Sequence, residues 1–217
     1  MDIRTKEAVR YLGYGNRAID EQTEELIRDS FKELEQVSRA KFIYRIFEIS
    51  ELNSDELMIG TMKVYSKHLC KNLKGCHAAF LICATLGAGV DMLMKRYTVT
   101  NMAKTAVLQA CATTLLEEYC DNIQKQLADM LEHNEYLRAR FSPGYGDFSI
   151  TYQKEILRMM NASKEIGLSL TDGYMLTPTK SITALIGITN EKIICHASGC
   201  EVCSKIDCTF RRGETGC

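Results

Sequence analysis

The cysteine-rich C-terminus holds the densest group of residues in this sequence that could do chemistry. Residues 195–217 read CHASGCEVCSKIDCTFRRGETGC, and four of their cysteines follow the spacing C-x4-C-x2-C-x4-C. Thiolates held close together by small, flexible connections can converge on one soft metal ion. The four candidate metal ligands are Cys195, Cys200, Cys203 and Cys208. The first three match the C-x4-C-x2-C part of plant-type 2Fe–2S ferredoxin loops, with Cys208 as a fourth ligand.

The same segment allows other interpretations. His196 could replace a thiolate as a zinc ligand, and Arg211 and Arg212 would offset the negative charge of a thiolate-bound centre. Without a metal, the segment is a reduced tail with free thiols. We therefore expect an iron–sulfur cluster or zinc, and keep the metal-free tail as the alternative.

A second group of candidate residues lies in the segment RFSPGYG, residues 140–146. Its proline stiffens the chain and its two glycines permit unusual backbone dihedrals, so backbone groups in such a loop can approach a ligand closely. Arg140, three residues before Pro143, would supply a fixed cation, and Tyr145 an amphipathic wall. The plainer interpretation is a Pro-Gly turn that closes an ordinary α+β domain.

Glu118 is the third candidate, on a long amphipathic helix predicted over residues 101–131. It follows Cys111 by seven residues and Leu115 by three, so it lies close to the apolar stripe, whereas Glu117 is turned about 100° away. A carboxylate beside an apolar face is costly unless it is paired or bound to a ligand. The alternative is a glutamate at the edge of the stripe that reaches water.

The order of these parts resembles the reductive-activation domain of cobalamin-dependent methionine synthase, most clearly over residues 103–189. The resemblance rests on Arg140 and its Pro-Gly-Tyr loop, a following helix, the Gly-Leu-Ser-Leu-Thr segment (167–171) and the run 175–187. In that family the arginine, the loop and an acidic residue of the long helix contact S-adenosylmethionine (AdoMet). The resemblance therefore implies AdoMet contacts at Glu118, Arg140, Pro143, Gly144 and Tyr145.

The resemblance also implies a function in methionine biosynthesis, as a free-standing activation subunit and a component of a methyltransferase rather than a complete enzyme. Cobalamin would be held by a partner, because the chain lacks the D-x-H-x-x-G motif that supplies the lower cobalt ligand in this family. The partner would be a cobalamin-bearing methionine synthase or a related corrinoid protein, served by an electron donor protein. Together they would remethylate inactive cob(II)alamin: one electron reduces the cobalt, and AdoMet donates the methyl group.

Two other functions fit parts of the sequence. One is a metal or iron–sulfur protein whose tail transfers electrons and whose body is a scaffold. The other is a free-standing AdoMet-dependent methyltransferase, supported by the Gly-Ala-Gly turn at residues 87–89, which could cradle an anionic group at a helix start. That turn lacks the third glycine and the downstream acid of a dinucleotide-binding fingerprint, so a packing turn is the favoured interpretation.

The helices and strands predicted around these residues indicate an α+β fold with a mainly antiparallel sheet flanked by helices. Residues 1–190 are predicted to form this domain, and residues 191–217 the tail. The spacing of apolar residues predicts helices over 17–38, from residue 90, over 101–131 and after the Pro-Gly-Tyr loop. Strands are predicted at 41–49, with both faces largely covered, at 76–86 and at 182–188, with a polar connection and one short helix at 50–75.

Composition narrows the class of protein. The 217 residues are 46% hydrophobic, enough to bury a substantial core, and the formal net charge of -1 gives no basic surface for nucleic acid or membranes. The N-terminus has no apolar signal segment, and ten cysteines without such a signal indicate a reducing compartment. We expect a cytoplasmic protein with no nucleic-acid or membrane partner.

Overall fold

The structure is a computed structural model that describes residues 2–15 and 17–191. These residues fall into two compact units. Among the described residues, the first contains the chain up to Ser38 and Ala88–Tyr119, and the second contains Arg39–Gly87 and the chain from Cys120 to Glu191. The predicted division at residue 190 stays a prediction, because the tail lies outside the described residues.

The first unit consists, in its described residues, of helices. They are α1 (Ile3–Tyr11), α2 (Glu21–Val37), α4 (Ala88–Thr100) and the first part of α5 (Met102–Ala128). The side chain of Asp2 caps α1 by accepting a hydrogen bond from the Thr5 N–H at 2.8 Å, and Asp20 caps α2 through Thr23 at 2.7 Å. Such carboxylates satisfy N–H groups that have no partner within the helix. The helix predicted over 17–38 is confirmed, but it begins only after its Asp20 cap.

α5 is the longest helix of the described residues, with 27 residues, and its position agrees with the predicted range. Ala103 and Ala106, which the helical spacing also places on the predicted apolar stripe, are exposed. The buried side chains are those of Val107, Leu108, Ala110, Cys111, Ala112, Thr114, Leu116, Cys120, Ile123 and Leu127. Neither α5 nor another helix in the described part of the chain is both long and apolar enough to cross a membrane.

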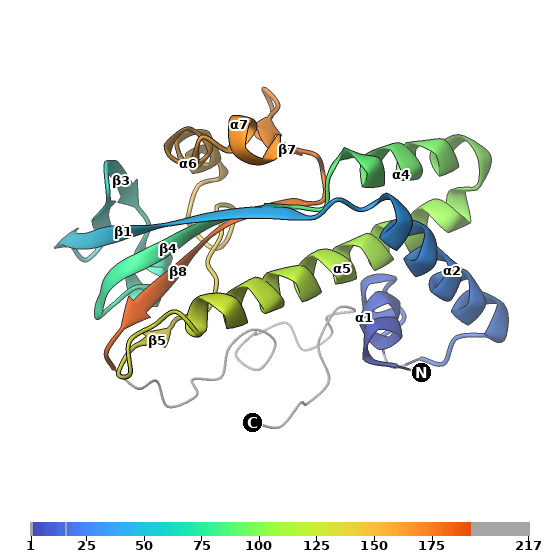
Figure 1. Ribbon diagram of the computed structural model, residues 1–217, viewed down its shortest axis with the longest axis horizontal. Coiled ribbons are helices and arrows are strands. Elements are labelled where there is room, and N and C mark those ends of the chain that lie inside the picture. The colour runs from blue at the N-terminus through green and yellow to red at the C-terminus, as the bar shows by residue number, and fades with distance from the viewer. Residues whose placement is uncertain (1, 16, 192–217) are drawn as a thin grey trace. The chain divides into compact units, whose positions relative to one another are not determined.

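Six strands of the described residues form one sheet in the second unit, in the order β3-β2-β1-β4-β8-β5 (Figure 1). They are β1 (Lys41–Asn53), β2 (Glu56–Ile59), β3 (Met62–Tyr65), β4 (Cys76–Thr85), β5 (Tyr136–Leu137) and β8 (Ser181–Thr189). All neighbouring pairs are antiparallel. β4 pairs with β1 on one side and β8 on the other, and its side chains are buried from Ala78 to Thr85. The α+β class with an antiparallel sheet and the buried strand at 76–86 are therefore confirmed.

The short helix predicted within residues 50–75 is confirmed, but the polar connection predicted before it is wrong. β1 continues to Asn53, and β2 and β3 form a hairpin before the short helix α3 (Lys67–Asn72). Along this hairpin, buried residues alternate with more exposed ones. Strands of four residues are too short for that alternation to stand out from a polar loop in the sequence.

The prediction that both faces of β1 are largely covered is also wrong. Ile43 and Phe47 pack against the core of the second unit, whereas Tyr44 and Ile46 are exposed. Successive side chains of a strand point to opposite faces, so only one face of β1 belongs to this core.

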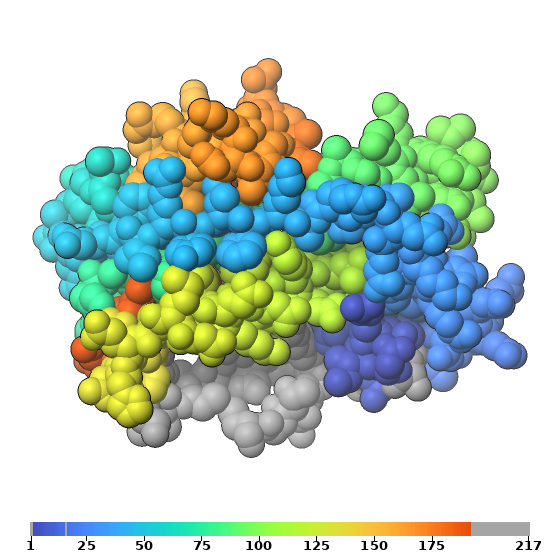
Figure 2. All heavy atoms as spheres, in the orientation of Figure 1, coloured from blue at the N-terminus to red at the C-terminus, as the bar shows by residue number. Residues whose placement is uncertain are grey.

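The core of the second unit lies between the sheet and two short helices, α6 (Gln153–Met160) and α7 (Ala162–Ile166). Both contact β1 and β4, and Figure 2 shows their side chains (orange) against those of β1 (light blue). Asn161, with φ of 51°, separates them in the left-handed conformation. The remaining short elements are η1 (Ile150–Tyr152), β6 (Ser169–Leu170) and β7 (Leu176–Thr177).

Candidate functional site

The loop at residues 141–148 is held to the sheet and closed on itself. Phe141 and Leu185 of β8 exchange backbone hydrogen bonds, both of 2.9 Å. The Gly144 N–H donates to the Phe148 carbonyl at 2.7 Å, and the Phe148 N–H donates to the Tyr145 carbonyl at 3.0 Å. Pro143 is buried, whereas the Tyr145 ring is exposed and meets Phe141 edge-on, with ring centroids 5.9 Å apart. The fold thus presents an aromatic ring on a fixed backbone, and the role of Tyr145 as a ligand contact stays a prediction.

The loop is also tied to the start of α3 through Asp147. Its carboxylate accepts hydrogen bonds from the Ser66 hydroxyl at 2.5 Å and from the backbone N–H groups of Lys67 at 2.9 Å and His68 at 3.1 Å. These bonds, that of Ser66 above all, lower the pKa of Asp147. Gly146 has φ of 54°, and a Cβ there would collide with the His68 ring. Sequence reasoning missed this anchor, for which the signal was a serine at the start of a short helix.

Arg140 is held by the last turns of α5. Its Nη1 lies 2.8 Å from Oδ1 of Asp121 and donates to Oε1 of Gln124 at 3.2 Å. Asp121 and Gln124 are three residues apart and therefore share one side of the helix. Only 17% of the Arg140 side chain is exposed, so the guanidinium is largely fixed before any ligand binds. Sequence reasoning missed both partners, although Asp121 follows Glu118 by one helical turn.

The neighbouring arginine, Arg138, has a different environment. Its Nη2 donates to the Lys74 carbonyl at 2.9 Å and lies 3.7 Å from Oε2 of Glu191. Its backbone N–H donates to the Gly187 carbonyl of β8 at 2.8 Å. Arg138 therefore fastens chain segments of the second unit to one another, which suits a structural role.

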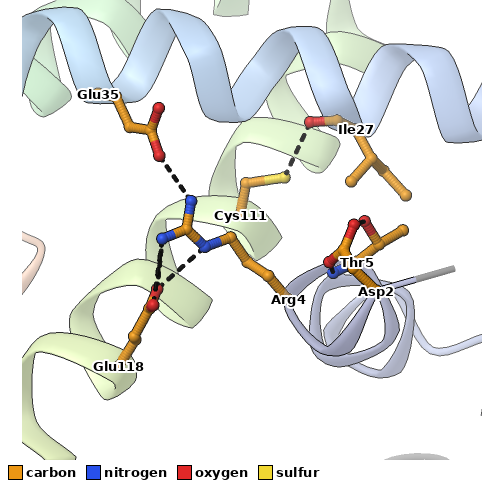
Figure 3. A network of polar contacts seen from close by, with 7 residues as sticks. All are labelled: Asp2, Arg4, Thr5, Ile27, Glu35, Cys111 and Glu118. Carbon is orange, nitrogen blue, oxygen red and sulfur yellow. Dashed lines mark hydrogen bonds and ion pairs between the residues drawn. The ribbon is translucent and has the colours of Figure 1, made fainter.

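Glu118 lies in the first unit and is bound by the N-terminal helix (Figure 3). Arg4 of α1 donates from Nε to Oε2 of Glu118 at 3.0 Å and from Nη2 to Oε1 at 3.1 Å. Arg4 Nη1 also donates to Oε1 of Glu35, on α2, at 2.6 Å. The hydrogen bond with Glu118 is the main cause that raises the pKa of Arg4. The Glu118 carboxylate is therefore paired, and 46% of its side chain remains exposed.

The Gly-Ala-Gly turn is explained by packing. Gly89 lies in the first turn of α4, where an added Cβ would collide with the carbonyl oxygen of Val37. A side chain at this position would separate α4 from the end of α2, which it contacts. This supports the packing interpretation over a phosphate cradle.

The predicted metal ligands Cys195, Cys200, Cys203 and Cys208 lie outside the described residues. Within residues 2–15 and 17–191, no group of three or more potential ligands could hold a metal ion. Cys83 and Cys111 are fully buried, and burial raises the pKa of each thiol to about 12. These two cysteines are core thiols.

Comparison with known proteins places the chain in a family. The sequence pattern of a family described as "Vitamin B12 dependent methionine synthase, activation domain" matches residues 77–193, more than half of the chain. No curated protein matches the sequence. Among solved structures, one titled "Crystal Structure of the MetH Reactivation Domain bound to AdoHcy" is similar, with a TM-score of 0.61 and 12% sequence identity. The match covers 88% of this chain and 78% of that chain, and at this identity it shows a shared fold.

The family match includes the Pro-Gly-Tyr loop, Arg140 and the helix position of Glu118, and the structural match covers most of both chains. The predicted resemblance is confirmed: this chain belongs to the activation-domain family of vitamin B12-dependent methionine synthase.

Proposed function

We propose that this chain binds AdoMet and presents it to a cobalamin-bearing partner, a methionine synthase or a related corrinoid protein. Family membership supports the role, and the solved structure of similar fold was determined with AdoHcy, the product that AdoMet leaves after methyl transfer. The proposed contacts are Glu118, Arg140, Pro143, Gly144 and Tyr145.

The observation that carries the proposal is the anchoring of Arg140 beside the Pro-Gly-Tyr loop. Asp121 and Gln124 orient the Arg140 guanidinium, and a guanidinium, with its five N–H donors, can serve several acceptors at once. An arginine held in this way can bind the carboxylate at the methionine end of AdoMet by a charge-assisted pair. Because its partners already fix the side chain, little conformational entropy is lost when the ligand binds.

The other candidate residues suit the remaining parts of AdoMet. Tyr145 offers an exposed aromatic face on a loop closed by three backbone hydrogen bonds, which fits the flat, partly apolar adenosine portion. Glu118 would pair with a cationic part of the ligand, its ammonium or sulfonium group. These residues fit the ligand chemically through a carboxylate, a cation and an aromatic surface.

In the proposed reaction the chain's residues bind and orient AdoMet, while the partner holds cobalamin. AdoMet supplies the methyl group once an electron donor has reduced the cobalt of cob(II)alamin. The contribution of this chain would be to position AdoMet, so that the methyl donor has a defined geometry when the two proteins meet.

A reconstituted reactivation assay tests this proposal. A methionine synthase loaded with cob(II)alamin and lacking its own activation domain is mixed with AdoMet and a chemical reductant, and the loss of the cob(II)alamin absorbance is followed. Addition of this chain should accelerate the loss, and its Arg140→Ala variant should not. The same rate with and without the chain would contradict the proposed role.

Metal binding by the tail is a separate proposal that rests on cysteine spacing. An iron–sulfur cluster held by Cys195, Cys200, Cys203 and Cys208 would serve electron transfer, whereas zinc at the same residues has no redox chemistry and could not. Metal analysis of anaerobically purified protein should find iron or zinc in the full chain and none after serine replacement of the four cysteines. Equal metal content in both would refute this proposal.

A further inference from the structure

Glu118 belongs to a group of three charged residues from three helices, all in the first unit (Figure 3). The Arg4 guanidinium lies between two carboxylates, with Glu118 at 2.9 Å and Glu35 at 2.6 Å. Its carbon Cζ also lies 5.5 Å from the centre of the Phe31 ring. The first turn of α1, which carries Arg4, is fixed in turn by the Asp2 cap.

The charge of this group suits a cationic ligand. A pair made of Arg4 and Glu118 alone would be neutral and would attract an ammonium group weakly. Glu35 adds a second carboxylate, so the three side chains together carry one net negative charge. One further cation would neutralise the group, which is what the ammonium end of an amino acid supplies.

The geometry leaves the Glu118 carboxylate able to accept further hydrogen bonds from a ligand. Arg4 binds both of its oxygens through two nitrogens, an arrangement that fixes the plane of the carboxylate. Each carboxylate oxygen can accept more than one hydrogen bond, and nearly half of the Glu118 side chain, 46%, is exposed. A ligand ammonium group can therefore reach a carboxylate whose orientation is already set.

We infer that Arg4 is a positioning residue that orients Glu118 for the ammonium group of AdoMet, and that Glu35 preserves the net negative charge this interaction requires. The inference rests on the proposed function, because it concerns the same ligand. It adds two residues of the N-terminal helices, neither of which lies in the range matched by the family pattern.

Calorimetric titration of full-length variants with two ligands tests the inference. AdoMet carries the ammonium group, whereas methylthioadenosine keeps the adenosine part, has a neutral thioether in place of the sulfonium, and lacks the amino-acid end. Glu35→Gln removes one negative charge and leaves Arg4 in place. The double variant Arg4→Gln/Glu35→Gln keeps the net charge at the wild-type value but releases Glu118, so it isolates orientation from charge.

Each of these two variants should bind AdoMet roughly 3- to 5-fold more weakly than wild type, the size of an exposed ion pair, with methylthioadenosine affinity unchanged. Glu25→Gln is the matched control on α2, because it removes one negative charge at an exposed position ten residues before Glu35, about 15 Å along the helix. It should change neither affinity. In a Glu118→Gln background, the double variant should cause no further loss, because its effect acts through Glu118.

Wild-type AdoMet affinity in both variants, in a protein where Glu118→Gln does weaken binding, would overturn the inference and leave the proposed function standing. An equal loss of methylthioadenosine affinity, with a lowered unfolding temperature, would also overturn it, since the residues would then act through the fold. No AdoMet binding by wild type would instead contradict the proposed function.

Discussion

Arg140 and Glu118, the two charged groups proposed to hold AdoMet, lie in different units of the chain and are supported differently. The Arg140 side chain is 17% exposed and is held by Asp121 and Gln124. The Glu118 side chain is 46% exposed. Glu35, which also pairs with Arg4, is on the surface as well. Interactions between exposed charges are weakened by water and salt, whereas partly buried ones are screened much less. Arg140 should therefore dominate the binding energy, and Glu118 should adjust it.

Arg140 and Glu118 can be held as described only if both units are well packed. The reactivity of a buried thiol in each unit measures this packing. Cys111 lies in the first unit and Cys83 in the second, and the pKa of each thiol is raised to about 12 by burial. At pH 8 their thiolate fraction is roughly a thousand-fold below that of a free cysteine, so iodoacetamide should leave both unlabelled in the native protein and label them in urea. Mass spectrometry of the alkylated peptides is the measurement. Fast native labelling of either cysteine would show that its unit is loosely packed.

The same shifts predict the direction of a pH effect on stability. A folded thiol with a raised pKa stays protonated after the unfolded thiol, with its ordinary value of 9.0, has ionised. The contribution of these thiols to stability is thus complete below pH 9 and is lost as the pH rises toward 12.

After the labelling of the buried thiols, the next largest effect is expected on AdoMet affinity when Arg140 is replaced. Arg140→Ala should weaken AdoMet binding by about 1.5–3 kcal/mol, or roughly 10- to 150-fold, because a charge-assisted pair is lost. Arg158→Ala is the matched control, since the Arg158 side chain is 72% exposed and pairs with Glu155 one turn away on the same helix. Arg138→Ala should also preserve affinity, although it removes contacts within the second unit. Comparable affinities for the Arg140 and Arg158 variants would remove Arg140 from the site.

A smaller effect is expected at Glu118. Glu118→Gln should weaken AdoMet binding roughly 5-fold at low salt, the upper range for an exposed ion pair, while Glu117→Gln should leave it unchanged. The two positions differ by about 100° around α5, so this pair also tests the helical register of the site. Sensitivity at Glu117 alone would show that the wrong face of α5 has been assigned.

The smallest expected effect is a difference between Arg140 and Glu118 in how strongly salt weakens their contribution to AdoMet binding. Raising the salt concentration from 0.05 to 0.5 M shortens the Debye length to a few ångströms, which screens exposed charges. The affinity ratio between wild type and Glu118→Gln should therefore shrink to roughly 2-fold or less, while the ratio for Arg140→Ala changes little. If both ratios collapse together, Arg140 is as exposed in solution as Glu118.

Sequence patterns predicted the parts of this fold that depend on long, regular repeats. The apolar run of β4 and the 27-residue helix α5 are each long enough to establish a period. The β2–β3 hairpin was missed because each strand has four residues. The loop motif identified Arg140 and Tyr145 because a family resemblance fixed their spacing.

The supporting contacts could not be predicted, because they join residues far apart in the chain. Arg4 and Glu118 are separated by 114 positions, and Ser66 and Asp147 by 81. Helical phase left open whether Glu118 is paired, bound to a ligand or in water, and the identity of its partner depends on how α1 folds back in the first unit. The orientation of a charged group is a tertiary property, which the local sequence does not contain.

A calorimetric titration of the full-length wild-type chain with AdoMet is the most direct test of whether this chain binds AdoMet through Arg140. We expect saturable binding of about one AdoMet per chain, weakened by Arg140→Ala and preserved in Arg158→Ala. Binding that survives Arg140→Ala undiminished would contradict the proposed site. No heat of binding at AdoMet concentrations up to the millimolar range would contradict the proposed function itself.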